Sequence, residues 1–239
     1  MNKNNIMFII ITILLIIIIT FHITLKKICD VEPEFYKYGN NNNFTILIIG
    51  STHGNEPAGH HIIKNLMNKL NSQQIILKNI NLILVPTVNY CGFKLNKRHN
   101  YLLNDINRQY KSNDKINKKI LELVDNSDFI IDFHEGYDFH QIDNNSLGST
   151  IGLTKWNGYI DLQNTILNNV NKDIHDKKQF VSIDLDKNDY DGTLSEYAKN
   201  NNKKYLLVEL SGQNGIQHMD IRVYQGLQIL QTVFNHFSN

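Results

Sequence analysis

Residues 46–59 read ILIIGSTHGNEPAG, an apolar run that stops at a glycine-rich turn and continues into a segment with helical spacing. A strand that ends in a turn before a helix is where open α/β sheets build their sites. The turn carries His53 and Glu56, three residues apart. One imidazole and one carboxylate at this spacing can bind the same cation, although a lone His-x-x-Glu also occurs in proteins without a metal.

A second histidine ends another apolar run, because residues 129–134 read FIIDFH. Two histidines and one glutamate, with a fourth position left for water, form the ligand set of a catalytic zinc. His134 could instead be a hydrogen-bonded core histidine, and His140 is a rival ligand in the following loop. The recurrence of polar residues at two strand exits beside glycines favours the zinc interpretation.

The rest of the chain alternates between strand and helix patterns, which predicts an α/β fold: a mainly parallel mixed sheet with helices on both faces. Strands are expected at residues 44–50, 81–88, 128–134, 148–154, 180–185 and 205–210. Helices are expected at residues 56–70, 115–124, 160–174, 193–200 and 216–237, with Thr193 as a candidate cap. The polar segment 89–110 has no periodicity and is expected to be a long loop, either functional or disordered.

The amino-terminal segment predicts one transmembrane helix. Residues 6–25 are almost uninterruptedly apolar, and about 20 such residues cross a bilayer. No small-residue cleavage site follows, so an uncleaved anchor is favoured over a signal peptide. Lys3 on one side and Lys26 and Lys27 on the other leave the sidedness open. We therefore expect a single-pass membrane protein with an anchor at 1–28, a linker at 29–43 and a catalytic domain at 44–239.

The net charge limits the classes of partner, and the cysteine count limits the number of disulfides. The net charge of +1, without basic clusters, argues against nucleic acid as a partner. Two cysteines exclude a framework of several disulfides. Cys91 is expected to be a small buried or loop residue, and Cys29 is a candidate for lipidation at the membrane edge.

Four segments resemble the motifs of the M14 zinc carboxypeptidase clan, which includes the succinylglutamate desuccinylase and aspartoacylase branch. They are GSTHGNEPAG at 50–59, NDINRQY at 104–110, DFHEG at 132–136 and VEL at 208–210, in the order that the clan has them. The resemblance implies the zinc carboxypeptidase-like fold and one Zn²⁺ per chain. It assigns the metal to His53, Glu56 and His134.

The resemblance also implies a catalytic role for Glu209 as the general base that acts on a zinc-activated water and then protonates the leaving amine. Arg98 is the candidate that polarises the scissile carbonyl. Tyr190 is the preferred candidate for a substrate-covering tyrosine, whereas Tyr197 lies in an expected helix and is better explained by packing.

Substrate binding and ligand orientation follow from the same motifs. Asn107 and Arg108 would hold a substrate carboxylate, because a guanidinium matches a carboxylate with two parallel hydrogen bonds. Asp132 and Glu135 flank His134, and either could orient a ligand imidazole.

These inferences predict a metalloenzyme that removes a C-terminal residue from peptides. One alternative is an N-acyl amino acid deacylase with the same zinc site, and another is a non-catalytic, membrane-anchored binding domain. The chain ends soon after the Glu209 strand, without room for the C-terminal β-domain of aspartoacylase-type enzymes, which favours the carboxypeptidase. The expected partners are a peptide or N-acyl amino acid with a free carboxylate, and the lipid bilayer around residues 6–25.

Overall fold

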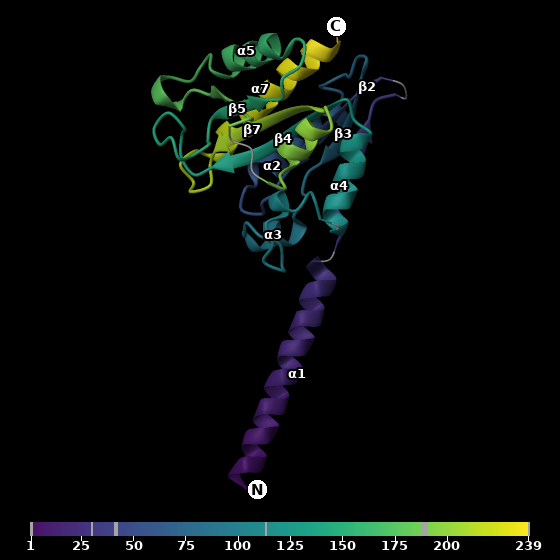
Figure 1. Ribbon diagram of the computed structural model, residues 1–239, viewed down its shortest axis with the longest axis vertical. Coiled ribbons are helices and arrows are strands. Elements are labelled where there is room, and N and C mark those ends of the chain that lie inside the picture. The colour runs from purple at the N-terminus through teal and green to yellow at the C-terminus, as the bar shows by residue number, and fades with distance from the viewer. Residues whose placement is uncertain (1, 30, 41–42, 113, 188–190, 239) are drawn as a thin grey trace.

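The domain is built on a seven-stranded mixed sheet, seen in the computed structural model in Figure 1, with the strand order β1-β3-β2-β4-β7-β5-β6. The structure describes residues 2–29, 31–40, 43–112, 114–187 and 191–238. The strands are β1 (Tyr36–Tyr38), β2 (Phe44–Gly50), β3 (Ile80–Val85), β4 (Phe129–Gly136), β5 (Thr150–Leu153), β6 (Val181–Ile183) and β7 (Lys204–Ser211). Parallel pairing joins β3, β2, β4 and β7, and also β5 and β6, whereas β1–β3 and β5–β7 are antiparallel.

Helices cover both faces of this sheet, as the alternating pattern predicts: α2 (Ala58–Asn71), α5 (Tyr159–Val170) and α7 (Met219–Ser238) on one face, and α4 (Lys115–Asp125) and α6 (Leu194–Asn200) on the other. The described residues also form α1 (Lys3–Cys29) and the short helix α3 (Tyr90–Leu95). Within the ranges that the structure describes, short 3₁₀ turns lie at Ile106–Arg108 and Asp176–Lys178. The predicted fold class is confirmed.

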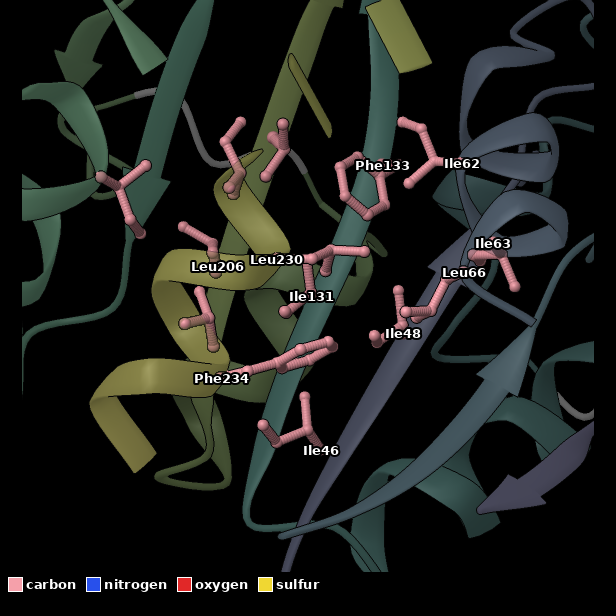
Figure 2. Packing of buried hydrophobic residues seen from close by; sticks show 14 of the residues in the cluster. Ile46, Ile48, Ile62, Ile63, Leu66, Ile131, Phe133, Leu206, Leu230 and Phe234 are labelled. Carbon is pink, nitrogen blue, oxygen red and sulfur yellow. The ribbon is translucent and has the colours of Figure 1, made fainter. Parts of the chain in front are cut away.

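The alternation of side chains along each central strand divides the core into two layers. In β2, Ile46 and Ile48 pack with α2, α5 and α7, and Leu47 and Ile49 pack on the opposite side with α4 and α6. Figure 2 shows the first layer, where Ile131 of β4 faces side chains from α2 and α7. Fully burying one such aliphatic side chain contributes about 1.5–3 kcal/mol to the stability of the fold. Because every central strand buries several of them on both faces, the two layers fix the positions of the strand ends.

Two segments differ from the sequence expectation. Residues 36–38 of the predicted linker form β1, which pairs with β3 at the edge of the sheet. The predicted loop 89–110 contains α3, where the Asn89 side chain caps the helix by accepting a hydrogen bond from the Gly92 backbone N–H at 2.9 Å. Both elements are too short for a hydrophobic period to reveal them. The predicted cap Thr193 is confirmed at the start of α6, where its hydroxyl accepts from the Glu196 N–H.

Helix α1 projects away from the domain (Figure 1). Residues Lys3–Thr24 are long and apolar enough to cross a membrane, and their most apolar 18-residue window has a mean hydropathy of 3.1; a signal sequence near an N-terminus shares this property. The helix ends at Cys29, which forms a disulfide with Cys91 in α3. Cys91 is buried, as expected, but the suggestion that Cys29 is lipidated was wrong, because its sulfur is bonded to Cys91. Sequence spacing could not reveal this pair, because the partners are 62 residues apart.

Candidate metal centre

The site lies where three parallel strands end side by side. In the register of the sheet, Ile49 of β2 is opposite Asp132 of β4, and His134 of β4 is opposite Glu209 of β7. The turn after β2 therefore reaches the end of β4. Its backbone is unusual, because Ser51 has a left-handed φ of 50° and its hydroxyl donates to the Glu56 carbonyl at 3.1 Å. This turn aims the following side chains over the edge of the sheet.

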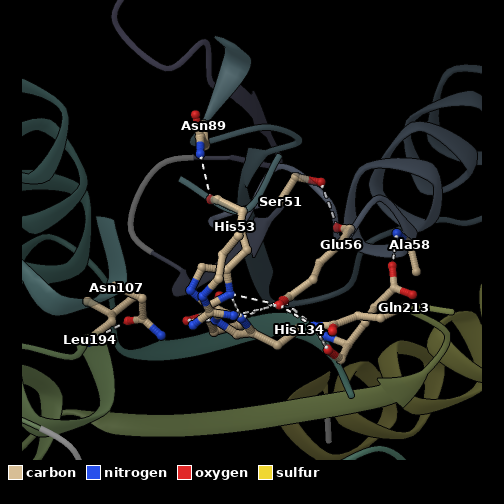
Figure 3. Close-up of polar contacts among 12 residues, drawn as sticks. Ser51, His53, Glu56, Ala58, Asn89, Asn107, His134, Leu194 and Gln213 are labelled. Atoms are coloured by element: carbon tan, nitrogen blue, oxygen red, sulfur yellow. Dashed lines mark hydrogen bonds and ion pairs between the residues drawn. The ribbon is translucent and has the colours of Figure 1, made fainter. Parts of the chain in front are cut away.

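The predicted ligands His53, Glu56 and His134 come together there (Figure 3). All three are buried, and their ligand atoms lie within 4.8 Å of one another. The Glu56 carboxylate is 2.8 Å from His53 Nδ1 through Oε1 and 2.9 Å from His134 Nδ1 through Oε2. The two Nδ1 atoms are 3.2 Å apart. Three donor atoms thus point to one small volume.

The outer nitrogens of both imidazoles face carboxylates. His53 Nε2 is 3.1 Å from Asp105 Oδ1, and His134 Nε2 is 3.2 Å from Asp132 Oδ2. A carboxylate at this position fixes Nε2 as the protonated nitrogen and leaves the lone pair on Nδ1. Two such lone pairs and a carboxylate repel one another unless a proton or a cation lies between them. The donor set therefore fits a divalent metal such as zinc, for which nitrogen and oxygen ligands are typical.

Electrostatics of the group agree with this fit. Burial favours the neutral form of His53, but the carboxylates of Glu56 and Asp105 outweigh burial and raise its pKa. For His134 the same balance, with Asp132 as the main counter-charge, raises the pKa well above its usual value. Burial opposes the charged form of Glu56, yet the neighbouring imidazoles lower its pKa. A cluster that attracts protons in this way can exchange them for a divalent cation.

Glu209 is a buried carboxyl beside His53, Glu56 and His134. It lies opposite His134 in the adjacent strand and lines the same cavity of about 240 Å³. Burial is the main cause that raises its pKa, to about 7. A carboxyl with this pKa can both accept and release a proton near neutral pH.

The other predicted site residues divide into those at the cavity and those elsewhere. Arg98, Asn107 and Arg108 line the cavity. Arg98 donates to Glu56 Oε1 at 3.3 Å and to Asp105 Oδ2 at 2.9 Å. The Asn107 side-chain oxygen accepts from the Leu194 N–H at 3.1 Å, which joins this loop to the start of α6.

Three further candidates from the sequence are Tyr190, Tyr197 and His140. Tyr190 lies outside the described residues. Tyr197 donates to Asp125 at the end of α4, in agreement with the packing role expected for it. His140 Nδ1 is 2.7 Å from the Ser146 carbonyl, and His140 is not part of the three-ligand group.

Of the two carboxylates that flank His134, Asp132 orients the imidazole. Glu135 has another role: its carboxylate accepts from the Ala58 N–H at 2.6 Å and forms a buried ion pair with Arg222 of α7. It therefore fixes the start of α2 and not a ligand ring. The alternation of a strand separates the two roles, because side chains at positions 132 and 134 share a face and position 135 points to the other.

Three further residues at the site were not predicted. Asp105 holds His53, Gln213 donates to Glu56 Oε1 at 2.8 Å, and the Tyr205 hydroxyl donates to Asp132 Oδ2 at 2.9 Å. Asp105 lies in the NDINRQY motif, and Tyr205 lies on the same face of its strand as Glu209. The sequence therefore contained features that could have identified both residues. Gln213 follows β7 in a loop, where no pattern marked it.

The fold is of the carboxypeptidase and desuccinylase type, and His53, Glu56 and His134 form a possible metal site at the carboxyl ends of its strands. Residues 42–236 match the family described as the succinylglutamate desuccinylase/aspartoacylase catalytic domain, and the chain belongs to this family. The resemblance to the M14 clan is thereby confirmed.

Solved structures share the fold. The chain is similar to the tripeptide-bound cell shape determinant Csd4 of Helicobacter pylori, with a TM-score of 0.71 and 18% identity over 86% of this chain and 55% of that one. A succinylglutamate desuccinylase from Silicibacter has a TM-score of 0.63 and 20% identity over 87% of this chain and 61% of that one. A metallo-carboxypeptidase from Burkholderia cenocepacia has a TM-score of 0.62 and 11% identity over 84% of this chain and 60% of that one. The chain thus spans little more than half of these proteins.

A shorter match exists among curated proteins. Carboxypeptidase SOL1 of Arabidopsis thaliana is 32% identical over 88 residues, which cover 34% of this chain and 16% of that protein.

Proposed function

We propose that the chain is a zinc-dependent, membrane-anchored carboxypeptidase that releases the C-terminal residue of a peptide. The observation that carries the proposal is the convergence of two Nδ1 lone pairs and the Glu56 carboxylate, with Glu209 on the neighbouring strand. Support for a peptide substrate comes from Csd4, which is described as a D,L-carboxypeptidase and has been solved with a bound tripeptide.

His53, Glu56 and His134 would hold the zinc ion. When bound, zinc supplies a Lewis acid that polarises the scissile carbonyl and acidifies a water molecule. Asp105 and Asp132 keep the two imidazoles in the tautomer that presents Nδ1 to the metal. Gln213 holds one oxygen of Glu56 by a hydrogen bond from the loop after β7.

Glu209 is the proton carrier of the proposed reaction. With its pKa raised to about 7, a substantial fraction is ionised at neutral pH and can take a proton from the attacking water. The same carboxyl can then give this proton to the departing amine, because its pKa lies close to the working pH. Arg98, at the cavity wall, is the group that we assign to the oxygen of the scissile carbonyl.

Arg108 and Asn107 are assigned to the free carboxylate of the substrate. Both line the cavity that contains Glu209 and the three metal ligands. A guanidinium can bind a carboxylate through two parallel hydrogen bonds, which fixes the distance from the chain end to the scissile bond. This geometry would restrict cleavage to the last peptide bond.

The test uses the full chain, purified in detergent and loaded with zinc. It is incubated with peptides that carry a free or an amidated C-terminus, and the products are identified by mass spectrometry. We expect single C-terminal residues to be released from the free peptides only. Glu209→Gln should lower the rate by about 10²–10⁴-fold, the contribution typical of a general base.

Glu122→Gln is the matched control, because Glu122 is 65% exposed on α4. It should leave the rate unchanged. A zinc-loaded Glu209→Gln protein with nearly normal turnover would contradict the mechanism. Zinc binding without any product would favour a non-catalytic binding domain.

The second candidate is an N-acyl amino acid deacylase. It is favoured by the family itself, whose description names succinylglutamate desuccinylase and aspartoacylase. Both candidates use the same metal ligands and the same carboxylate clamp, and they differ in the group beyond the scissile bond. Release of a free acyl group from N-succinyl or N-acetyl amino acids, with no cleavage of peptides, would select the deacylase.

A further inference from the structure

The disulfide fixes how far helix α3 can lie from the membrane that α1 is proposed to cross. The Cα atoms of Cys29 and Cys91 are 4.9 Å apart, and the apolar span ends at Thr24. At a rise of 1.5 Å per residue, Cys29 lies about 7.5 Å beyond that end. The polar headgroup layer is about 5–8 Å thick on each side of a bilayer. Cys29 and its partner in α3 therefore lie at the level of the headgroups.

Helix α3 and the turn at residues 101–103 expose apolar side chains. Leu95 follows Cys91 by one helical turn, on the same face, and is 52% exposed. Tyr90, at the start of the helix, is 40% exposed. In the turn that follows, Leu102 and Leu103 are 52% and 83% exposed. Figure 1 shows α3 at the end of the domain from which α1 projects.

Basic residues accompany these apolar side chains. Lys94 and Lys97 are exposed, and Lys94 lies over the Tyr90 ring at 5.6 Å. Segment 90–103 contains no aspartate or glutamate. Exposed leucines, an interfacial tyrosine and lysines are the composition of surfaces that enter the headgroup region of a membrane.

We propose that this surface is a membrane-docking face, which rests on the same bilayer that α1 enters. It consists of Tyr90, Lys94, Leu95, Lys97, Leu102 and Leu103. The proposal rests on the membrane anchor of the proposed function but does not depend on the reaction catalysed. The leucines and the tyrosine contact the boundary between headgroups and acyl chains, and the lysines contact lipid phosphates.

Docking also sets the height of the metal centre. Gly54, between the ligands His53 and Glu56, packs on the backbone of Gly92 in α3 so closely that a Cβ would have no space. The Gly54 N–H also donates to the Arg98 carbonyl at 3.4 Å. The metal-binding turn is thus attached directly to the docking segment, and the site is held close to the bilayer surface. Substrates that are presented at this surface would be within its reach.

The experiment measures contact with lipid and needs no activity. Tryptophan is introduced in the full chain at Leu103, at Ile76 and at Phe8, in three separate variants. Ile76 is the matched control, because it is 75% exposed but lies before β3, at the opposite end of that strand from α3. Phe8 lies within α1 and reports whether the anchor is inserted. The proteins are reconstituted in phosphatidylcholine–phosphatidylglycerol vesicles with and without brominated acyl chains.

Brominated lipid should reduce the Leu103→Trp emission about twofold relative to Ile76→Trp, because interfacial side chains enter the bilayer by about 5–10 Å. Trp156 gives the background common to all variants, measured in the unmodified chain. If brominated lipid quenches Phe8→Trp but reduces the emission of Leu103→Trp and Ile76→Trp by the same fraction, the docking face is overturned and the anchor is left intact. Unquenched Phe8→Trp would overturn both, and neither result would touch the proposed hydrolysis.

Discussion

Replacing Asp132 by asparagine should weaken zinc binding through His134 without removing a ligand. Asp132 is fully buried, and its Oδ2 accepts from His134 Nε2 at 3.2 Å and from the Tyr205 hydroxyl at 2.9 Å. A neutral amide has one acceptor oxygen and lacks the charge that makes the imidazole a stronger ligand. Loss of such a partner typically costs about 10–100-fold in metal affinity, which corresponds to about 1.4–2.7 kcal/mol.

The assay is a competition titration of zinc between the full-length protein and a chromogenic chelator at constant pH. Asp128→Asn is the matched control, because Asp128 directly precedes β4 and accepts from the Thr45 N–H at the opposite end of the strand from the metal site. Its zinc Kd should not change. A folded Asp132→Asn protein with a Kd within about twofold of the unmodified chain would refute the orienting role, because the expected loss is at least about tenfold.

Three other predictions concern the proton carrier, the α7 ion pair and the disulfide. Burial raises the pKa of Glu209 to about 7, and the ionised form is the base, so kcat/KM should fall as the pH drops below about 7. A fall in kcat/KM only near pH 4.5, the ordinary pKa of a glutamate, would contradict this. Arg222→Met should lower the free energy of unfolding by about 3–5 kcal/mol, because it leaves the buried Glu135 carboxylate without its ion-pair partner. An unchanged midpoint of chemical denaturation would contradict this stabilising role of the ion pair. Protein from an oxidising compartment should show no maleimide-reactive thiol under denaturing conditions until it is reduced, because Cys29 and Cys91 are bonded to each other; labelling before reduction would contradict the disulfide.

The sequence predicted every strand except the short edge strand β1, and it predicted the residues that gather at the strand ends. The runs at 46–49 and 129–133 are apolar at every position except Asp132, which marks strands buried on both faces. Parallel strands bring their carboxyl ends to one edge, so the pattern alone was enough to expect that His53, Glu56 and His134 meet. The apolar strand pattern was informative because the backbone of the sheet sets the distances between His53, Glu56 and His134.

The residues that the sequence did not reveal depend on loops and side-chain packing. Gln213 reaches Glu56 from a loop, and Arg222 reaches Glu135 from a helix 87 positions away. Strand alternation places Asp132 on the face of His134 and Glu135 on the other face, so this distinction was available from the sequence. What the sequence did not show is the partner on the second face, where Glu135 meets the guanidinium of Arg222.

The segment without periodicity joins the anchor to the site. Within residues 89–105, Cys91 is bonded to Cys29 at the end of α1, Gly92 packs against Gly54, Arg98 donates to Glu56, and Asp105 contacts His53. A stretch with so many specific tertiary contacts has no freedom to keep a hydrophobic period, because each position is chosen by a different partner. Its polarity on the site side and its leucines on the outer side follow from these two neighbours, a buried cluster of charges and the proposed bilayer.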